Sequence, residues 1–254
     1  MGADGRALRV TAAIAPLQAE PRAGSEQLSQ RLAGHRVEML SASEPWLRVR
    51  GSDGYEGWMH RGYLTDSPDS EKEGSRISLG CVVRGVEGRR SQLPLGAFLS
   101  DGATLESGGA VSVSEQRAHF PADREPVTAS ACAFFDGTPY VWGGITPWGC
   151  DCSGMIQSIF ALHGVPLPRD ARDQALMGRV AGGVISELES ADLLFFSDRD
   201  DRRITHVGIS LGGPRMVHVA LGRGGFALED LEQRADPYVI ALRQRFLFAR
   251  RVLC

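Results

Sequence analysis

Residues 140–154 read YVWGGITPWGCDCSG, a glycine-rich, aromatic turn that places Cys152 between Asp151 and Ser153. The chain continues as MIQSIFALHGV, whose apolar residues recur at helical spacing and predict a helix that begins at or near Cys152. Unpaired backbone N–H groups and the helix dipole favour negative charge there, so we expect this thiol to ionise easily. The DCSG string alone fits a nucleophile and a small buried side chain equally well.

Two histidines lie in consecutive strand-like runs further along the chain. The runs are ITHVGISLGG and PRMVHVALGRGG, which meet at a Gly-Gly-Pro turn, and they carry His206 and His218. Two adjacent antiparallel strands can place both imidazoles side by side, facing the cysteine. A cysteine nucleophile needs a base and a third polar group that orients the base, so these histidines favour the catalytic interpretation of Cys152.

Six short motifs follow one another along residues 126–254: YVWGG, DCSG, LPRDA with Gln174, ADLLFF, HVGI and VHVA. In order and spacing they resemble the NlpC/P60 cysteine peptidases, which cut bacterial cell-wall peptides. The resemblance implies that Cys152 is the nucleophile, His206 the general base and His218 the orienting residue. It also implies that the hydroxyl of Tyr140 helps to hold the developing oxyanion, together with backbone N–H groups near the cysteine.

The chain departs from that family in two places. The family usually has a glycine in the turn before the paired aromatics, where this chain has Ser190, Ala191 and Asp192. It commonly has an aromatic or aliphatic residue just before DCSG, where this chain has Cys150. The first departure predicts a turn that does not need a positive φ angle. The second places another thiol near the nucleophile, which would make the site sensitive to oxidation.

The N-terminal half predicts two small domains. Residues 1–66 have short alternating runs between Pro and Gly turns and resemble bacterial SH3 (SH3b) domains in the pieces EPRAGSEQLSQ, LAGHRVEML, PWLRV and DGYEGWM. A polar linker is expected over residues 67–75, and a second SH3-like barrel over residues 76–122. The predicted fold is therefore an α+β papain-like catalytic domain over residues 123–254, with helices on an antiparallel sheet, preceded by two small β-barrels.

This layout is similar to that of the γ-D-glutamyl-L-diamino acid endopeptidases of the same family. The resemblance implies hydrolysis of the bond after D-glutamate in murein peptides of the type L-Ala-γ-D-Glu-diaminopimelate, in cell-wall peptide recycling. It further implies that the first barrel restricts the cleft to peptides with a free N-terminal L-alanine. The ammonium group of that alanine, once buried in the cleft, must be paired with a carboxylate of the protein.

Several residues are candidates for binding such a peptide. By the resemblance Asp170 binds the amine, although it could instead cap a helix near Ala171. In the barrel, Glu20 is preferred to Glu26 as the second carboxylate and could also be a solvated charge. Arg169 fits a pair with Asp151 and a pair with the substrate carboxylate equally well. The predicted substrate-binding residues are Asp170, Glu20, Tyr55, Trp142, Asp151, Ser153 and Arg169.

Composition limits the other functions. The chain of 254 residues is 43% hydrophobic and 23% charged, as in an ordinary soluble protein, and its net charge of −3 gives no reason to expect nucleic-acid binding. MGADGRALRV lacks the pattern of a signal peptide and no run of 18 apolar residues occurs, so we expect a cytoplasmic protein without membrane association. An exported protein whose leader has been removed would read the same way.

No metal is expected, because the five cysteines form neither an even framework nor a zinc-type pair. The expected acyl-transfer chemistry requires no cofactor. The sequence leaves the oligomeric state open, and a monomer is preferred. Two other functions remain open. A broader papain-like amidase or acyltransferase would keep Cys152 and His206 without needing Asp170. A catalytically silent wall-binding protein would use the SH3 barrels alone, and the complete set of Tyr140, Cys152, His206 and His218 argues against it.

Overall fold

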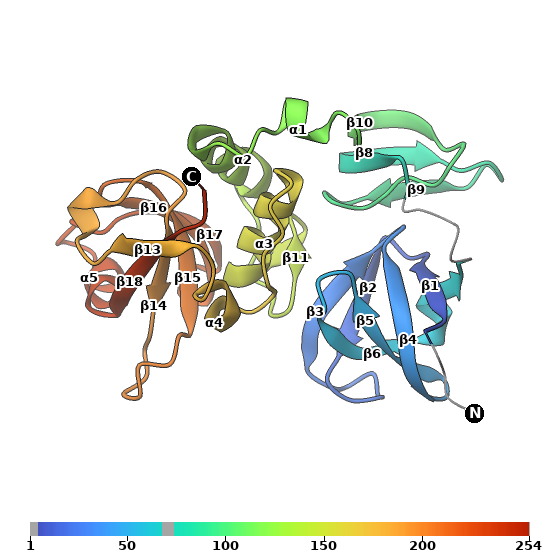
Figure 1. Ribbon diagram of the computed structural model, residues 1–254, viewed down its shortest axis with the longest axis horizontal. Coiled ribbons are helices and arrows are strands. Elements are labelled where there is room, and N and C mark those ends of the chain that lie inside the picture. The colour runs from blue at the N-terminus through green and yellow to red at the C-terminus, as the bar shows by residue number, and fades with distance from the viewer. Residues whose placement is uncertain (1–4, 68–73, 254) are drawn as a thin grey trace. The chain divides into compact units, whose positions relative to one another are not determined.

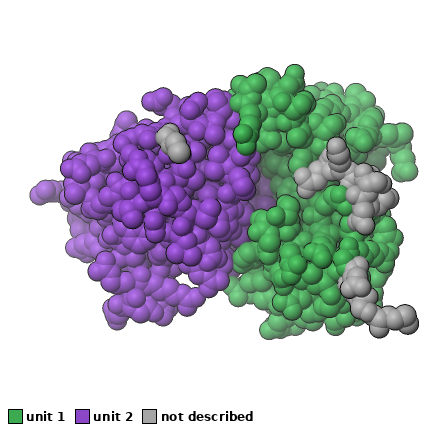
Figure 2. All heavy atoms as spheres, in the orientation of Figure 1, with its two compact units in different colours: residues 1–119 green, residues 120–254 purple. Residues whose placement is uncertain are grey.

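The computed structural model describes residues 5–67 and 74–253 and divides the chain into two compact units, Met1–His119 and Phe120–Cys254. Figure 1 shows the elements and Figure 2 the two units. The unit boundary follows residue 119, whereas the sequence placed the start of the catalytic domain at residue 123. Residues 68–73 of the predicted linker and residues 1–4 of the N-terminal segment lie outside the described residues, and the predicted domain bounds remain predictions.

Unit 1 opens with a seven-stranded antiparallel sheet in the order β3-β2-β6-β5-β4-β1-β7. Its sequence alternates apolar and polar residues: in β5, Leu47 and Val49 are buried while Arg48 and Arg50 are exposed. Alternation with a period of two turns one face of every strand toward a shared core. The elements are β1 (Ala7–Val10), β2 (Ile14–Gln18), β3 (Gln27–Leu32), β4 (Arg36–Ser43), β5 (Trp46–Gly51), β6 (Glu56–His60), the 3-10 helix η1 (Arg61–Tyr63) and β7 (Leu64–Asp66).

The second part of unit 1 is a three-stranded antiparallel sheet in the order β10-β8-β9. Its strands are β8 (Arg76–Arg84), β9 (Arg90–Leu93) and β10 (Thr104–Ser112), and the short helix α1 (Gln116–His119) follows. The sequence predicted a second barrel here, and its closure into a barrel remains a prediction.

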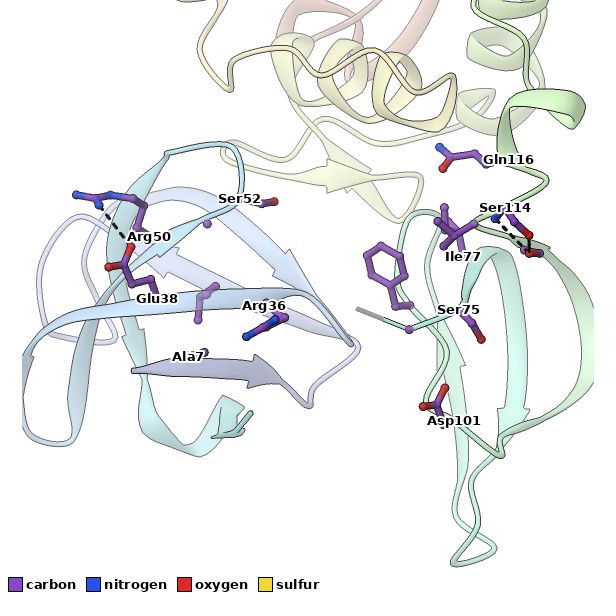
Figure 3. Close-up of a pocket in the computed structure, with 16 residues that line it drawn as sticks. Ala7, Arg36, Glu38, Arg50, Ser52, Ser75, Ile77, Asp101, Ser114 and Gln116 are labelled. Carbon is purple, nitrogen blue, oxygen red and sulfur yellow. Dashed lines mark hydrogen bonds and ion pairs between the residues drawn. The ribbon is translucent and has the colours of Figure 1, made fainter. Parts of the chain in front are cut away.

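The two parts of unit 1 meet at Gly34, where a Cβ atom would lie 2.6 Å from Cβ of Phe98. The Phe98 N–H donates to the Ala33 carbonyl at 2.8 Å. Figure 3 shows the pocket that both parts line, with Arg50 and Glu38 paired at one edge at 3.4 Å. Gly34 has a φ angle of +81° as well, so this junction depends on a residue without a side chain.

Unit 2 packs helices against a six-stranded antiparallel sheet in the order β13-β18-β14-β15-β16-β17. Figure 1 shows α2 and α3 beside this sheet, and α3 contacts β15 and β16. The elements are α2 (Arg124–Phe135), β11 (Ile145–Thr146), β12 (Gly149–Cys150), α3 (Cys152–Leu162), α4 (Ala171–Gln174), β13 (Arg179–Gly182), η2 (Ile185–Glu187), β14 (Leu193–Phe196), β15 (His206–Gly212), β16 (Arg215–Ala220), η3 (Leu221–Arg223), β17 (Gly225–Asp230), α5 (Pro237–Gln244) and β18 (Phe246–Arg251).

The central helix α3 begins and ends at residues that the sequence supplies for that purpose. Asp151 is the N-cap, and its carboxylate accepts a hydrogen bond from the N–H of Gly154 at 2.8 Å. Gly164, with a φ angle of +71°, terminates the helix. Between these ends the helix buries its apolar side chains Met155, Ile156, Ile159, Phe160 and Leu162. The sequence prediction of a helix starting at Cys152 is confirmed.

The prediction that the turn at Ser190–Asp192 avoids a positive φ angle is wrong. Ala191 has a φ angle of +64°. Its N–H donates to the Ser210 carbonyl at 2.9 Å, and the buried carboxylate of Asp192 is paired with Arg251 at 2.7 Å. Contacts on both sides hold this turn in a conformation that costs an alanine about 1 kcal/mol or more.

Candidate active site

Cys152 is the first residue of α3, at the end of a tight turn that β11 and β12 form. The turn and the helix approach very closely, since a Cβ atom at Gly154 would lie 2.0 Å from the carbonyl oxygen of Gly144. The glycine of DCSG is therefore a steric requirement of the turn. The Cys152 side chain is buried, with 8% of the residue exposed.

A buried ion pair holds this turn in place. Arg169 donates to both carboxylate oxygens of Asp151, at 3.0 and 2.6 Å, and to Oγ of Ser153 at 2.8 Å. Asp151 also accepts from the N–H groups of Gly143 and Gly154, each at 2.8 Å. Both carboxylate oxygens are thus engaged within the protein. Of the two pairs that the sequence left open for Arg169, the structure has the one with Asp151.

Burial of Cys152 opposes the easy ionisation that its place at the start of a helix predicts. Burial and, after it, the negative charge of Asp151 raise the pKa of the thiol to about 12. The N–H groups of Val207 and Ser153 act in the opposite direction, as does the guanidinium of Arg169, but they do not outweigh burial. The resting nucleophile is therefore a thiol, and it needs a base within reach.

The contact with Val207 brings the cysteine to the start of β15, where the base candidate lies. His206 is the first residue of β15, and His218 lies in the middle of β16. Nε2 of His206 is 2.8 Å from Nδ1 of His218. Burial and the neighbouring His218 lower the pKa of His206 well below its usual value of about 6.5. The structure thus pairs the two imidazoles at the start of β15, next to Val207, whose N–H contacts the cysteine.

Tyr140 lies within electrostatic range of the nucleophile. Its backbone bridges to Cys150, and its N–H donates to the Gly224 carbonyl at 2.9 Å. Burial, followed by the charges of Cys152 and Asp151, raises the pKa of its hydroxyl well above the usual range. The hydroxyl therefore keeps its proton and is available as a hydrogen-bond donor, which is what an oxyanion needs.

The remaining predicted residues occupy different surroundings. Trp142 is 59% exposed at the rim of the nucleophile turn. Asp170 precedes α4, makes no side-chain cap and pairs with Arg172 at 3.1 Å. In unit 1, Glu20 pairs with its loop neighbour Arg22 at 2.7 Å, and Tyr55 packs against the barrel core. The binding roles assigned to these residues from the sequence remain predictions.

One polar residue beside the histidines was not predicted from the sequence. Glu229 of β17 is 7% exposed, and its Oε1 lies 3.5 Å from Nε2 of His218. A single glutamate in a strand-like run gives no signal of its own, because only the pairing of β16 with β17 shows that it faces a histidine. Among residues 5–67 and 74–253, no group of three His, Cys, Asp or Glu side chains could hold a metal ion.

Comparison with known proteins identifies two domains in the chain. Residues 137–239, which contain the cysteine and both histidines, match the NlpC/P60 family. The chain contains an NlpC/P60 domain. Residues 15–65 match the bacterial SH3 domain and cover most of the first barrel. Both the predicted family and the prediction of a cysteine peptidase domain are confirmed.

Named relatives extend the comparison. A stretch of 87 residues is 47% identical to the gamma-D-glutamyl-L-lysine dipeptidyl-peptidase of Bacillus subtilis, covering 34% of this chain and 29% of that protein. A protein of the same name from Bacillus cereus is 25% identical over 75% of this chain and 66% of its own length. Dipeptidyl-peptidase 6 of Lysinibacillus sphaericus is 29% identical, over 90% of this chain and 93% of its own. The chain thus spans less than two thirds of the first two relatives.

A solved structure supports the fold. An NlpC/P60 family protein from Bacillus cereus superposes with a TM-score of 0.79, covering 98% of this chain and all of that one, at 19% sequence identity. At this low identity the superposition shows the fold alone. The superposition confirms the predicted α+β class of the NlpC/P60 domain with its N-terminal SH3-like region. No helix among the described residues is long and apolar enough to cross a membrane.

Proposed function

We propose that this protein is a cysteine endopeptidase that hydrolyses the γ-D-glutamyl-L-diamino acid bond of murein peptides with a free N-terminal L-alanine. The observation that carries the proposal is the arrangement of three residues. Cys152 lies at the start of α3, and His206 and His218 contact each other from the neighbouring strands β15 and β16. Two relatives are named gamma-D-glutamyl-L-lysine dipeptidyl-peptidases, and these names support the proposed choice of the bond that is cut.

The reaction begins with transfer of a proton. Because the thiol of Cys152 and the imidazole of His206 are both neutral at rest, the thiolate forms only as its proton moves to the imidazole. The thiolate attacks the γ-carbonyl carbon of D-glutamate and forms a tetrahedral oxyanion. The hydroxyl of Tyr140 donates a hydrogen bond to this oxyanion, in surroundings where burial strengthens the interaction.

Collapse of the oxyanion expels the diamino acid, whose leaving amine takes the proton from His206. A thioester between L-Ala-γ-D-glutamate and Cys152 remains. Water, deprotonated by His206, then attacks the thioester and returns the thiol. The buried pair of Asp151 and Arg169 keeps the cysteine turn fixed through both halves of the reaction.

Asp170 supplies the negative charge that the proposed substrate requires. Its side chain is 28% exposed, lies one residue beyond the buried Arg169 and is not used to cap α4. A carboxylate that is partly exposed at this place suits an incoming ammonium group. The ammonium of a free L-alanine would compete with Arg172, the present partner of Asp170, for this carboxylate.

The proposal is tested with L-Ala-γ-D-Glu linked to lysine or to diaminopimelate, each with a free and with an acetylated N-terminus. Mass spectrometry should detect L-Ala-γ-D-Glu from both free peptides and little from the acetylated ones. Cleavage of free and acetylated peptides at equal rates would exclude recognition of the amine. If neither is cut while Cys152 is alkylated normally, the broader amidase function is favoured. Comparison of the two diamino acids establishes which one is preferred.

We also propose that the enzyme acts in the recycling of wall peptides inside the cell, because short peptides with a free amine arise there rather than in intact wall. Cell fractionation with an antibody to the protein tests this location. Recovery in the cytosol is expected, and recovery mainly outside the cell would contradict it.

A further inference from the structure

The strand register places Glu229 on the side of the sheet where His218 lies. In the β16–β17 pair Met216 is opposite Glu229, and His218 is opposite Ala227. Residues two apart on a strand share a face, so His218 and Glu229 are diagonal neighbours on one face. His218 is completely buried, and its Nε2 lies 3.5 Å from Oε1 of Glu229, beyond the range of a normal hydrogen bond. This nitrogen hydrogen-bonds no other described residue.

Glu229 is held firmly as a carboxylate. Arg223 donates two hydrogen bonds to this carboxylate. The distance from Nε to Oε1 is 2.6 Å, and the distance from a terminal nitrogen to Oε2 is 3.1 Å. The guanidinium is itself fixed by Asp236 and by the ring of Tyr238, whose centroid is 4.2 Å away. Burial alone would raise the pKa of Glu229, but His218 and Arg223 together lower it. The group that faces His218 is therefore a fixed negative charge.

A carboxylate accepts hydrogen bonds and donates none, so it selects the His218 tautomer with a proton on Nε2. Nδ1 of that tautomer is unprotonated and can only accept. The 2.8 Å contact then requires that His206 donate from its Nε2. A neutral imidazole carries a single N–H, so Nδ1 of His206 is left unprotonated. That nitrogen is the one remaining to take the thiol proton.

We propose that Glu229 is a positioning residue that sets the tautomers of both histidines and so keeps Nδ1 of His206 ready to act as the base. The assignment of the two tautomers is independent of the substrate, whereas its catalytic consequence rests on the proposed function. When His206 accepts the thiol proton, the positive charge is shared with His218 through the 2.8 Å hydrogen bond. The Glu229 carboxylate stabilises that charge as its distance to Nε2 shortens.

Nitrogen-15 NMR of the histidine side chains tests the tautomers directly in substrate-free protein at mildly alkaline pH. We expect both His206 and His218 to carry their proton on Nε2. In Glu229→Ala, His206 should shift substantially toward the tautomer protonated on Nδ1. Asp236→Asn is the matched control, because it removes a carboxylate from the same arginine without touching His218, and it should leave the tautomers unchanged.

A purely structural role of Glu229 would lower the melting temperature without changing the tautomers of the folded protein, and that result would overturn the proposal. A wild-type His206 protonated on Nδ1 would also overturn it. If Glu229→Ala does not fold, Glu229→Leu takes its place: it keeps much of the volume but offers no acceptor, and should again increase the Nδ1-protonated form. An unchanged tautomer ratio in Glu229→Leu would then overturn the proposal.

On the substrate, folded Glu229→Ala should lose about 10- to 100-fold in kcat, a part of the roughly 10²- to 10⁴-fold that general acid–base catalysis contributes, with KM nearly unchanged. An equal kcat in variant and wild type would contradict the catalytic consequence. Absence of cleavage by the wild type would count against the proposed function and leave the NMR result valid.

Discussion

Nε2 of His206 lies 2.8 Å from Nδ1 of His218, a contact that joins the first residue of one strand to the centre of the next. His206 is half-buried and His218 is fully buried, so water does not replace this hydrogen bond. The pair therefore responds as one unit to a proton that arrives at His206. A buried thiol with a raised pKa needs such a base, in which two coupled imidazoles share the proton's charge.

His218→Ala should lower kcat by about 10²- to 10⁴-fold, because the base loses its orientation and the stabilisation of its positive charge. Steady-state kinetics on the free-amine peptide measures this loss. His163→Gln is a suitable control, since His163 is equally buried but bonds to Pro121 and Ser130. That control should lower the melting temperature while kcat/KM stays unchanged. Equal losses in both variants would mean that His218 acts only through stability.

The pH dependence of thiol ionisation should reflect burial. Since burial raises the pKa of Cys152 to about 12, the thiolate should be scarce at neutral pH and increase only in strongly alkaline solution. The difference in ultraviolet thiolate absorbance between wild type and Cys152→Ser isolates this thiol from the other cysteines. A full thiolate signal from Cys152 at pH 6 to 7 would show instead that the resting site is a thiolate–imidazolium pair.

Arg169→Gln should destabilise the NlpC/P60 domain by about 3–5 kcal/mol, because it leaves the buried carboxylate of Asp151 without its charged partner. Denaturant unfolding followed by fluorescence measures the change. Arg172→Gln removes an arginine from a more exposed pair with Asp170 and should change stability by less than about 0.5 kcal/mol. Similar values for the two variants would rule out the buried pair as the support of the nucleophile turn.

Asp170→Ala should raise KM for the free-amine peptide roughly 10- to 100-fold with little change in kcat, as expected when a charged hydrogen bond to the substrate is lost. Asp173→Ala is the matched control, because Asp173 is a more exposed carboxylate in α4, the short helix that follows Asp170. It should leave KM unchanged. An unaltered KM in Asp170→Ala would remove this residue from the binding site.

The elements around the cysteine could be predicted because their signals are local. The N-cap aspartate, the apolar spacing after Cys152 and the Gly-Gly-Pro turn between the histidine strands each lie within a few residues of what they determine. The pKa of the thiol could not be predicted, since it depends on burial by segments distant in the chain. The same holds for Ala191, whose positive φ angle is maintained by its hydrogen bond to Ser210 and by the ion pair of the next residue, Asp192, with Arg251.

The position of Glu229 could not be predicted from the sequence for a different reason. Its relation to His218 depends on the register of β16 and β17, and a shift by one residue would turn its side chain to the other face of the sheet. Nothing in the run GFALED fixes that register by itself. Motifs in the sequence can therefore identify Cys152, His206 and His218 without revealing the carboxylate that faces His218.

The central claim is that Cys152 forms a thioester with the γ-carboxyl of D-glutamate. The most direct test is mass spectrometry of products and intact protein after rapid mixing with L-Ala-γ-D-Glu-diaminopimelate, for wild type and Cys152→Ala. We predict L-Ala-γ-D-Glu and diaminopimelate from the wild type, a transient acyl group on the peptide that contains Cys152, and neither from the variant. Release of the same products by Cys152→Ala, or cleavage of the L-Ala–D-Glu bond instead, would contradict the account.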